Sequence, residues 1–127
     1  KPVEIPMKLN LSETPALAVT GYGPGYLMAG GIRYEHALLI RPDTPPRRWP
    51  LAGITELSAE LLAPLVEGEV PEIVLIGTGK AQVFPDPAVL RPLIEARVGI
   101  EIMNTAAACR TYNVLIAEGR RVVAALC

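Results

Sequence analysis

The chain has 127 residues, half of them hydrophobic, and its 12 lysines and arginines against 13 aspartates and glutamates leave a formal net charge of −1. A chain of this length forms a single domain, residues 1–127, that can bury a core without the support of disulfide bonds or metal ions. Its near-neutral charge excludes a general attraction to nucleic acid or anionic lipid. No apolar run reaches the roughly 18 residues that a membrane-spanning helix needs, so we expect a soluble protein with no membrane span and no nucleic-acid partner.

The first half of the chain is predicted to be rich in β-hairpins. Residues 1–14 contain two prolines and alternate only weakly in polarity, so they form either an irregular N-terminal extension or an edge strand. Residues 16–23, "ALAVTGYG", predict a strand that ends in a Gly-Pro-Gly turn. Residues 26–29 and 32–40 then predict a hairpin around the turn Gly30-Gly31.

A proline-rich stretch separates the two halves of the chain. Residues 42–50 hold 4 of the 13 prolines and are predicted to form a loop, with Trp49 near its end. After this loop, residues 58–66 predict a short helix with Ser58 as its N-cap, and Pro64 is expected to kink or shorten that helix.

The second half of the chain alternates between strands and helices. Residues 73–77, "IVLIG", form a continuous apolar run typical of a strand covered on both faces. Asp86 and Pro87 open a helix that runs to about residue 96. The remaining elements are a strand at 99–103, a helix that Thr105 caps and Gly119 ends, and a strand at 121–126. This order predicts parallel pairing at the centre, with right-handed crossovers, so a hairpin-rich first half packs against a βαβαβ second half.

Neither the glycine motif nor the histidine predicts cofactor or metal chemistry. The motif "IGTGK" lacks the third glycine of the dinucleotide fingerprint because position 82 is Gln. Residues 81–85 look extended, whereas a phosphate loop leads into a helix, so a tight turn is the favoured interpretation. His36 falls in an apolar row of the strand 32–40, and nothing places it beside Cys109 or a metal ligand. We therefore expect no cofactor and no metal site.

The helix that begins near Thr105 carries polar side chains within an apolar sequence. Helical spacing makes it apolar around most of its circumference, as in a helix packed at the centre of a domain. Asn113 is then a buried amide that needs partners, and Tyr112 buries its ring while its hydroxyl reaches a partner. Arg110 lies one turn inside the N-terminus, where a positive charge is unfavourable unless an acid or anion compensates it.

These residues allow two interpretations. In the first, a small anion binds where two strands end, in a cradle made of Gly77, Thr78, Gly79, Lys80, Thr105 and Arg110. In the second, Arg110, Tyr112 and Asn113 form a hydrogen-bond network that holds loops to the core. We favour the second interpretation because one network accounts for every residue without a ligand.

The 2 cysteines, Cys109 and Cys127, bear on both compartment and chemistry. A disulfide scaffold usually has more cysteines in a shorter chain, so we expect free thiols in a reducing compartment, the cytoplasm. No secretory signal is visible, and a chain that begins at Lys1 is compatible with a removed leader. Cys109 lies about one turn from the helix amides, which can lower the pKa of a thiol, although a buried cysteine more often behaves as a small apolar side chain.

Three stretches of the sequence together resemble the Mth938-like domain family. They are "GYGPGYLMAGGIRYEHALLIRP", "PEIVLIGTGK" and "VGIEIMNTAAACRTYNVLIAEGRRVVAAL", and the most specific part is "TAAACRTYN". The resemblance spans roughly residues 16–126. The family commonly has Asp at the position of Asn104, so any role that needs a carboxylate there is not carried over to this chain.

The resemblance implies a three-layer α/β fold with a central mixed sheet. It implies no catalytic residue, because the family has no established enzyme mechanism. The family includes mitochondrial complex I assembly factor 3, which binds another protein, and many uncharacterised bacterial and archaeal proteins. We therefore expect a non-enzymatic protein-binding domain similar to an assembly factor.

Two other functions stay open at this stage, and so does the place of the interaction surface. The alternatives are a domain that binds a small anion and a thiol-dependent enzyme that uses Cys109. The exposed candidates for a protein-binding surface are the hairpin at Gly30-Gly31 and the loop that carries Trp49, because tryptophan is a frequent anchor at interfaces. Trp49 suits the edge of the core equally well.

Overall fold

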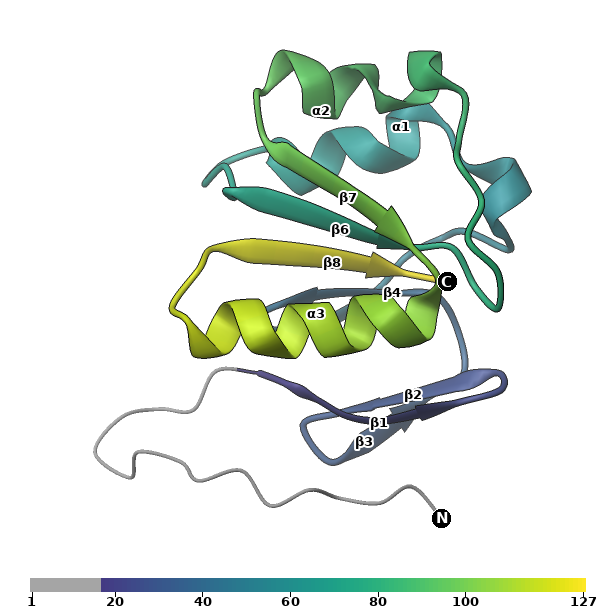
Figure 1. Cartoon of the computed structure of the whole chain (residues 1–127), viewed down its shortest axis with the longest axis vertical. Helices are drawn as coiled ribbons and strands as arrows, with labels where there is room; N and C mark the ends of the chain where they lie inside the picture. The colour runs from purple at the N-terminus through teal and green to yellow at the C-terminus, as the bar shows by residue number, and fades with distance from the viewer. Residues whose placement is uncertain (1–16) are drawn as a thin grey trace.

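A five-stranded sheet lies at the centre of the domain. The computed structural model describes residues 17–127, so the extension or edge strand predicted for residues 1–14 lies outside the described residues. Figure 1 shows short helices on one face of the sheet, one long helix on the other face, and a small second sheet beyond the long helix. This arrangement confirms the α/β fold with a mixed central sheet and layers of helix on both of its faces.

The small sheet is built from the predicted hairpins. Its antiparallel strands, in the order β1-β2-β3, are β1 (Val19–Gly23), β2 (Tyr26–Ala29) and β3 (Ile32–Tyr34). The turn between β2 and β3 needs two consecutive residues with positive φ, which Gly30 (58°) and Gly31 (79°) adopt without a steric cost.

The predicted continuous strand at 32–40 is wrong, because the chain changes sheets within it. Strand β3 ends at Tyr34, and β4 (Leu38–Arg41) joins the central sheet instead. The two pieces have different surroundings, since Ile32 is 57% exposed whereas Leu38 is fully buried. Alternation within one strand therefore does not apply across Glu35 to Ala37, and His36 lies at the crossing between the two sheets.

The central sheet has the predicted parallel centre. Strand β6 (Ile73–Gly77) pairs in parallel with both β7 (Gly99–Met103) and β8 (Val122–Leu126), and β4 pairs antiparallel with β8. The spatial order is β5-β4-β8-β6-β7. Because β8 and β6 are inner strands, their side chains are buried on both faces, which explains the continuous apolar runs of both segments.

The prolines predicted a loop at residues 42–50, but part of this segment forms a strand. Strand β5 (Thr44–Arg48) pairs antiparallel with β4 at the edge of the central sheet. Proline is tolerated there because an edge strand needs no N–H groups on its outer side. Pro45, Pro46 and the exposed arginines at 47 and 48 also make this edge a poor template for another strand.

The short helices cover one face of the central sheet. They are η1 (Ile54–Glu56), α1 (Ala59–Leu62), η2 (Ala63–Val66), η3 (Pro87–Leu90) and α2 (Arg91–Glu95). The predicted helix at 58–66 changes from α to 3-10 geometry around Pro64, and Ser58 makes no side-chain capping bond. Asp86 does cap its helix, since its carboxylate accepts from the N–H of Ala88 at 2.9 Å.

The long helix α3 (Thr105–Ala117) packs between the two sheets (Figure 1). Its N-cap is Asn104, whose Oδ1 accepts from the N–H of Ala107 at 2.8 Å, so the prediction of Thr105 as the cap is wrong by one residue. Gly119, with a φ of 76°, ends the helix as predicted. No helix among residues 17–127 has the length and apolar character needed to cross a membrane.

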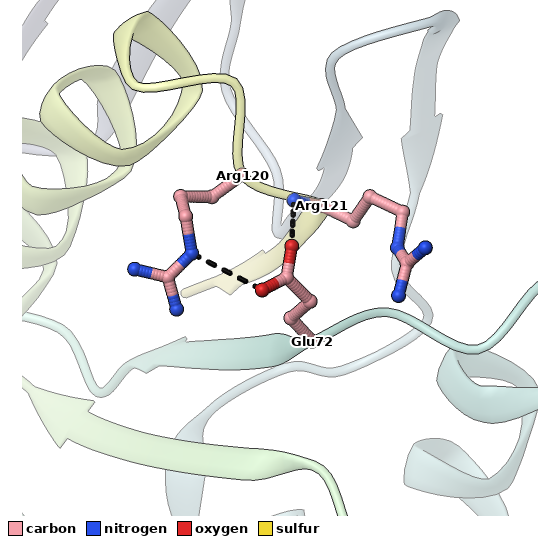
Figure 2. A network of polar contacts seen from close by, with 3 residues as sticks. All are labelled: Glu72, Arg120 and Arg121. Atoms are coloured by element: carbon pink, nitrogen blue, oxygen red, sulfur yellow. Dashed lines mark hydrogen bonds and ion pairs between the residues drawn. The ribbon is translucent and has the colours of Figure 1, made fainter.

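An acidic side chain joins the starts of the parallel strands β6 and β8. Figure 2 shows Glu72, just before β6, accepting from the Nε of Arg120 at 3.2 Å and from the N–H of Arg121 at 3.1 Å. These bonds, first of all the one from the N–H of Arg121, hold the pKa of Glu72 below its usual value of 4.5. The contact fixes the register between β6 and β8 at the end of the sheet opposite the site described next.

Candidate functional site

The polar residues of α3 join the helix to the small sheet. Asn113 donates from Nδ2 to the carbonyl of Val19 at 2.7 Å and accepts the N–H of Val19 on Oδ1 at 2.9 Å. The hydroxyl of Tyr112 donates to the carbonyl of Leu17 at 2.8 Å, and burial raises the pKa of this phenol. Two side chains of the helix thus satisfy backbone groups at the start of β1 and just before it.

Arg110 takes a separate position. Its guanidinium donates to the hydroxyl of Tyr22 at 2.8 Å, and the side chain lies at the surface. It therefore contacts the outer part of the small sheet rather than the core.

Cys109 faces the core that α3 shares with both sheets. Its side chain is 1% exposed. Burial raises the pKa of the thiol to about 12, and the nearby positive charge of Arg110 offsets only part of this effect. Of the two behaviours considered for Cys109, this burial favours that of a small apolar side chain.

We expect Cys109 to be unreactive in the folded protein. In the variant Cys127→Ser, which removes the other thiol, a thiol reagent at pH 8 is expected to label nothing in the native state and one group in urea. Labelling of the native variant at the rate of a free small thiol would contradict this expectation and restore Cys109 as a possible nucleophile.

The turn after β6 and the start of α3 are bonded to each other. The hydroxyl of Thr105 accepts the N–H of Gly79 at 2.8 Å and donates to the carbonyl of Cys127 at 3.1 Å. The hydroxyl of Thr78 donates to the carbonyl of Ala81 at 2.5 Å and accepts the N–H of Val83 at 3.1 Å. Most polar groups of the predicted anion cradle thus already have protein partners.

Gly77 has a steric role in the same junction. A Cβ atom at this position would lie 3.0 Å from both the Leu126 side chain and the Thr105 hydroxyl, and 3.1 Å from the Thr105 backbone. Glycine therefore allows α3 to begin directly against β6. This close approach explains the glycine without a phosphate ligand.

A cavity of about 700 Å³ opens beside this junction. It lies between the small sheet and the carboxyl ends of β6, β7 and β8. Its lining residues are Tyr22, Gly23, Pro24, Gly25, Tyr26, Leu27, Tyr34, Glu35, His36, Ala37, Leu51, Ala52, Gly79, Lys80, Asn104, Thr105, Ala106 and Cys127. Of the predicted cradle, the structure brings Gly79, Lys80 and Thr105 to this cavity, whereas Gly77, Thr78 and Arg110 do not line it. The binding of an anion stays a prediction.

Sequence reasoning missed the tyrosines and His36 as members of one site. Tyr22, Tyr26 and Tyr34 come from the three strands of the small sheet, far in sequence from Lys80. The available signal was a cluster of aromatic residues around the turn at residues 23–25. Without the packing of the small sheet on α3, nothing connected that cluster to the end of β6.

Among residues 17–127, no group of three or more histidine, cysteine, aspartate and glutamate side chains is placed to hold a metal ion. Cys109 and Cys127 are both free cysteines. Burial raises the pKa of the Cys127 thiol to about 11.

Both the sequence and the fold of this chain match known proteins. Residues 19–127 match the family described as "Protein of unknown function (DUF498/DUF598)". The chain belongs to this family. A solution structure of a Mth938-like domain from Bordetella pertussis has a TM-score of 0.77 and 38% sequence identity, over 94% of this chain and 91% of that one. The resemblance to the Mth938-like family is thereby confirmed.

One of two curated relatives is uncharacterized, and the other is named as an assembly factor. An uncharacterized protein of Rhodobacter capsulatus is 41% identical over 87% of this chain and 84% of its own length. The bovine NADH dehydrogenase [ubiquinone] 1 alpha subcomplex assembly factor 3 is 42% identical over 90% of this chain, but only 62% of that protein is covered. The bovine relative therefore has a substantial part with no counterpart in this match.

Of the two positions considered for Trp49, an exposed anchor and the edge of the core, the structure of this Mth938-like domain shows the second. Trp49 is 2% exposed and donates from Nε1 to the carbonyl of Leu61 at 3.1 Å, so it belongs to the core edge and is not available to a partner. The most exposed large apolar side chain among residues 17–127 is Phe84, at 71%, next to Val83 at 41%. Both lie on the loop that follows β6.

Proposed function

We propose that this Mth938-like domain is a non-enzymatic protein-binding module that takes part in the assembly of a protein complex. The bovine relative, which matches over 90% of this chain, is named as an assembly factor. The observation that carries the proposal is the exposed aromatic ring of Phe84, on a loop that the protein holds in place.

The loop around Phe84 is held by one bond within the loop and by one bond to β7. The hydroxyl of Thr78 accepts the N–H of Val83 at 3.1 Å. The side chain of Gln82 donates to the carbonyl of Ile102, in β7, at 2.8 Å. An exposed aromatic side chain on a pre-ordered loop loses little conformational entropy when it enters a pocket of a partner.

The burial of Cys109 argues against the alternative of a thiol-dependent enzyme. Cys109 lies in the core, and burial raises the pKa of its thiol to about 12. A thiolate at neutral pH would therefore be scarce and inaccessible. The protein-binding proposal needs no reactive group.

The test is affinity purification from the organism of origin with three tagged forms: the wild-type chain, Phe84→Ala and Val114→Ala. Val114 is 57% exposed on α3 and serves as a matched loss of exposed apolar surface on another element. We expect one partner with the wild type and with Val114→Ala, and at least a tenfold lower recovery with Phe84→Ala, as for a central interface anchor. Equal recovery with all three forms, or no partner at all, would overturn the proposal.

A further inference from the structure

We propose that the cavity between the small sheet and the carboxyl ends of β6 and β7 binds a small organic carboxylate with an aromatic or apolar body. This site is separate from Phe84 and goes beyond the protein-binding function, because its occupant is a small molecule. The inference rests on the position of the cavity, on its aromatic wall and on its charge.

The size and position of the cavity are those of a ligand site. Its volume is about 700 Å³, within the range of about 300–1,000 Å³ typical of pockets for small molecules. Gly79 and Lys80 follow β6, and Asn104 and Thr105 follow β7, so the cavity lies beyond the carboxyl ends of two parallel strands. Open α/β sheets bind their ligands in this place.

The three tyrosines that line the cavity each contact a neighbouring side chain. The guanidinium of Arg33 lies 4.1 Å from the ring centre of Tyr26. The hydroxyl of Tyr22 accepts from Arg110 at 2.8 Å. The ring of Tyr34 meets that of His36 edge to face, with centres 5.9 Å apart. The tyrosine side chains of the lining are thus held in place, so an apolar ligand body can pack against them at little entropic cost.

The charge of the cavity favours one negative group. Lys80 lines it, and no ion pair within residues 17–127 joins Lys80 to a carboxylate. The acidic residue of the lining, Glu35, is paired with the Nε of Arg33 at 2.9 Å, which compensates its charge. Lys80 is therefore the charged side chain of the lining that has no ion-pair partner within residues 17–127.

His36 adds a second polar group. Its Nδ1 lies 2.9 Å from the carbonyl of Ala37, and because a carbonyl only accepts, Nδ1 carries the hydrogen. This bond fixes the ring and leaves Nε2 of the neutral imidazole as a hydrogen-bond acceptor, which suits a donor group on the body of a ligand rather than its carboxylate.

A carboxylate fits this set of groups better than a phosphate does. Phosphate sites usually combine several amide donors with more than one cation. Here the hydroxyl of Thr105 and the N–H of Gly79 are bonded to each other, and Lys80 is the single lysine of the lining. One cation opposite an aromatic wall is the pattern expected for a monoanion with an apolar body.

Isothermal titration calorimetry with defined probes tests the proposal. The probes are 3-phenylpropionate and indole-3-acetate, with neutral 3-phenylpropionamide and inorganic phosphate for comparison. The proteins are the full chain, Lys80→Gln, Ala52→Trp and Arg47→Gln. Ala52 is an exposed residue of the lining, so a tryptophan there fills the cavity, and Arg47 is an exposed arginine of β5 outside the lining that controls for the lost charge. Circular dichroism confirms that each variant is folded.

The expected result is binding of at least one carboxylate probe by the full chain and by Arg47→Gln with equal affinity. Lys80→Gln and the neutral amide are each expected to raise the Kd by about tenfold or more, as for the loss of a charge-assisted contact. Ala52→Trp is expected to abolish binding. The inference is overturned if neither carboxylate binds at millimolar concentration. It is also overturned if phosphate binds as well as they do, or if the binding survives in both Lys80→Gln and Ala52→Trp.

Discussion

Replacing Trp49 with alanine is expected to lower the free energy of unfolding by about 3–5 kcal/mol, the usual cost of removing a large buried aromatic side chain. Trp49 is 2% exposed and lies in the core beneath α1 and α2. The substitution leaves a cavity there and removes the donor to the carbonyl of Leu61. It also loosens the chain between β5 and η1.

Urea unfolding followed by circular dichroism measures this loss, because the variant has no tryptophan fluorescence. Trp49→Phe keeps most of the buried ring and is expected to lose less stability than Trp49→Ala. Arg48→Ala, at the exposed neighbouring position, is expected to stay within about 0.5 kcal/mol of the wild type. A Trp49→Ala protein as stable as the Arg48→Ala control would show that Trp49 does not support the core.

Asn113→Ala is expected to cost about 2–4 kcal/mol, because it leaves two partly buried backbone groups without partners. Both the N–H and the carbonyl of Val19 are bonded to the Asn113 side chain. Val19 begins β1, so the loss also weakens the attachment of the small sheet to α3. Faster hydrogen exchange is expected first in β1 and β2.

The control for Asn113→Ala is Val114→Ala, the next residue of the same helix, whose side chain is 57% exposed. Its stability is expected to change by no more than about 0.5 kcal/mol. Denaturant unfolding gives the stability difference, and hydrogen exchange monitored by NMR gives its location. An Asn113→Ala protein that keeps the wild-type stability and exchange pattern would exclude a structural role for the amide.

The second half of the fold could be predicted because its signals are local. A continuous apolar run, a capping carboxylate before a proline and a terminating glycine each act over a few residues, as at residues 73–77, at Asp86 and at Gly119. The errors arose where a distant partner decides the structure. Strand β5 forms despite Pro45 and Pro46 because β4 offers it an edge, and residues 32–40 divide because two sheets compete for them.

The candidate site shows the same division. The sequence pointed to the ends of two strands and to Lys80 and Thr105, because the carboxyl ends of neighbouring parallel strands meet at one edge of the sheet. It also indicated that Asn113 and Tyr112 need hydrogen-bond partners, since a helix that is apolar on nearly every side is buried.

The tertiary structure alone decided what those groups contact. The small sheet packs on α3, so Tyr22, Tyr26 and Tyr34 line one cavity with residues that follow β6, more than 40 residues away in sequence. The same packing buries Cys109 and so raises the pKa of its thiol to about 12. The sequence thus determined the strands and helices of the second half and which side chains of α3 need partners, because those preferences depend on neighbouring residues. Cavity, burial and charge at the site depend on which surfaces meet, and only the packing of the two sheets around α3 determines that.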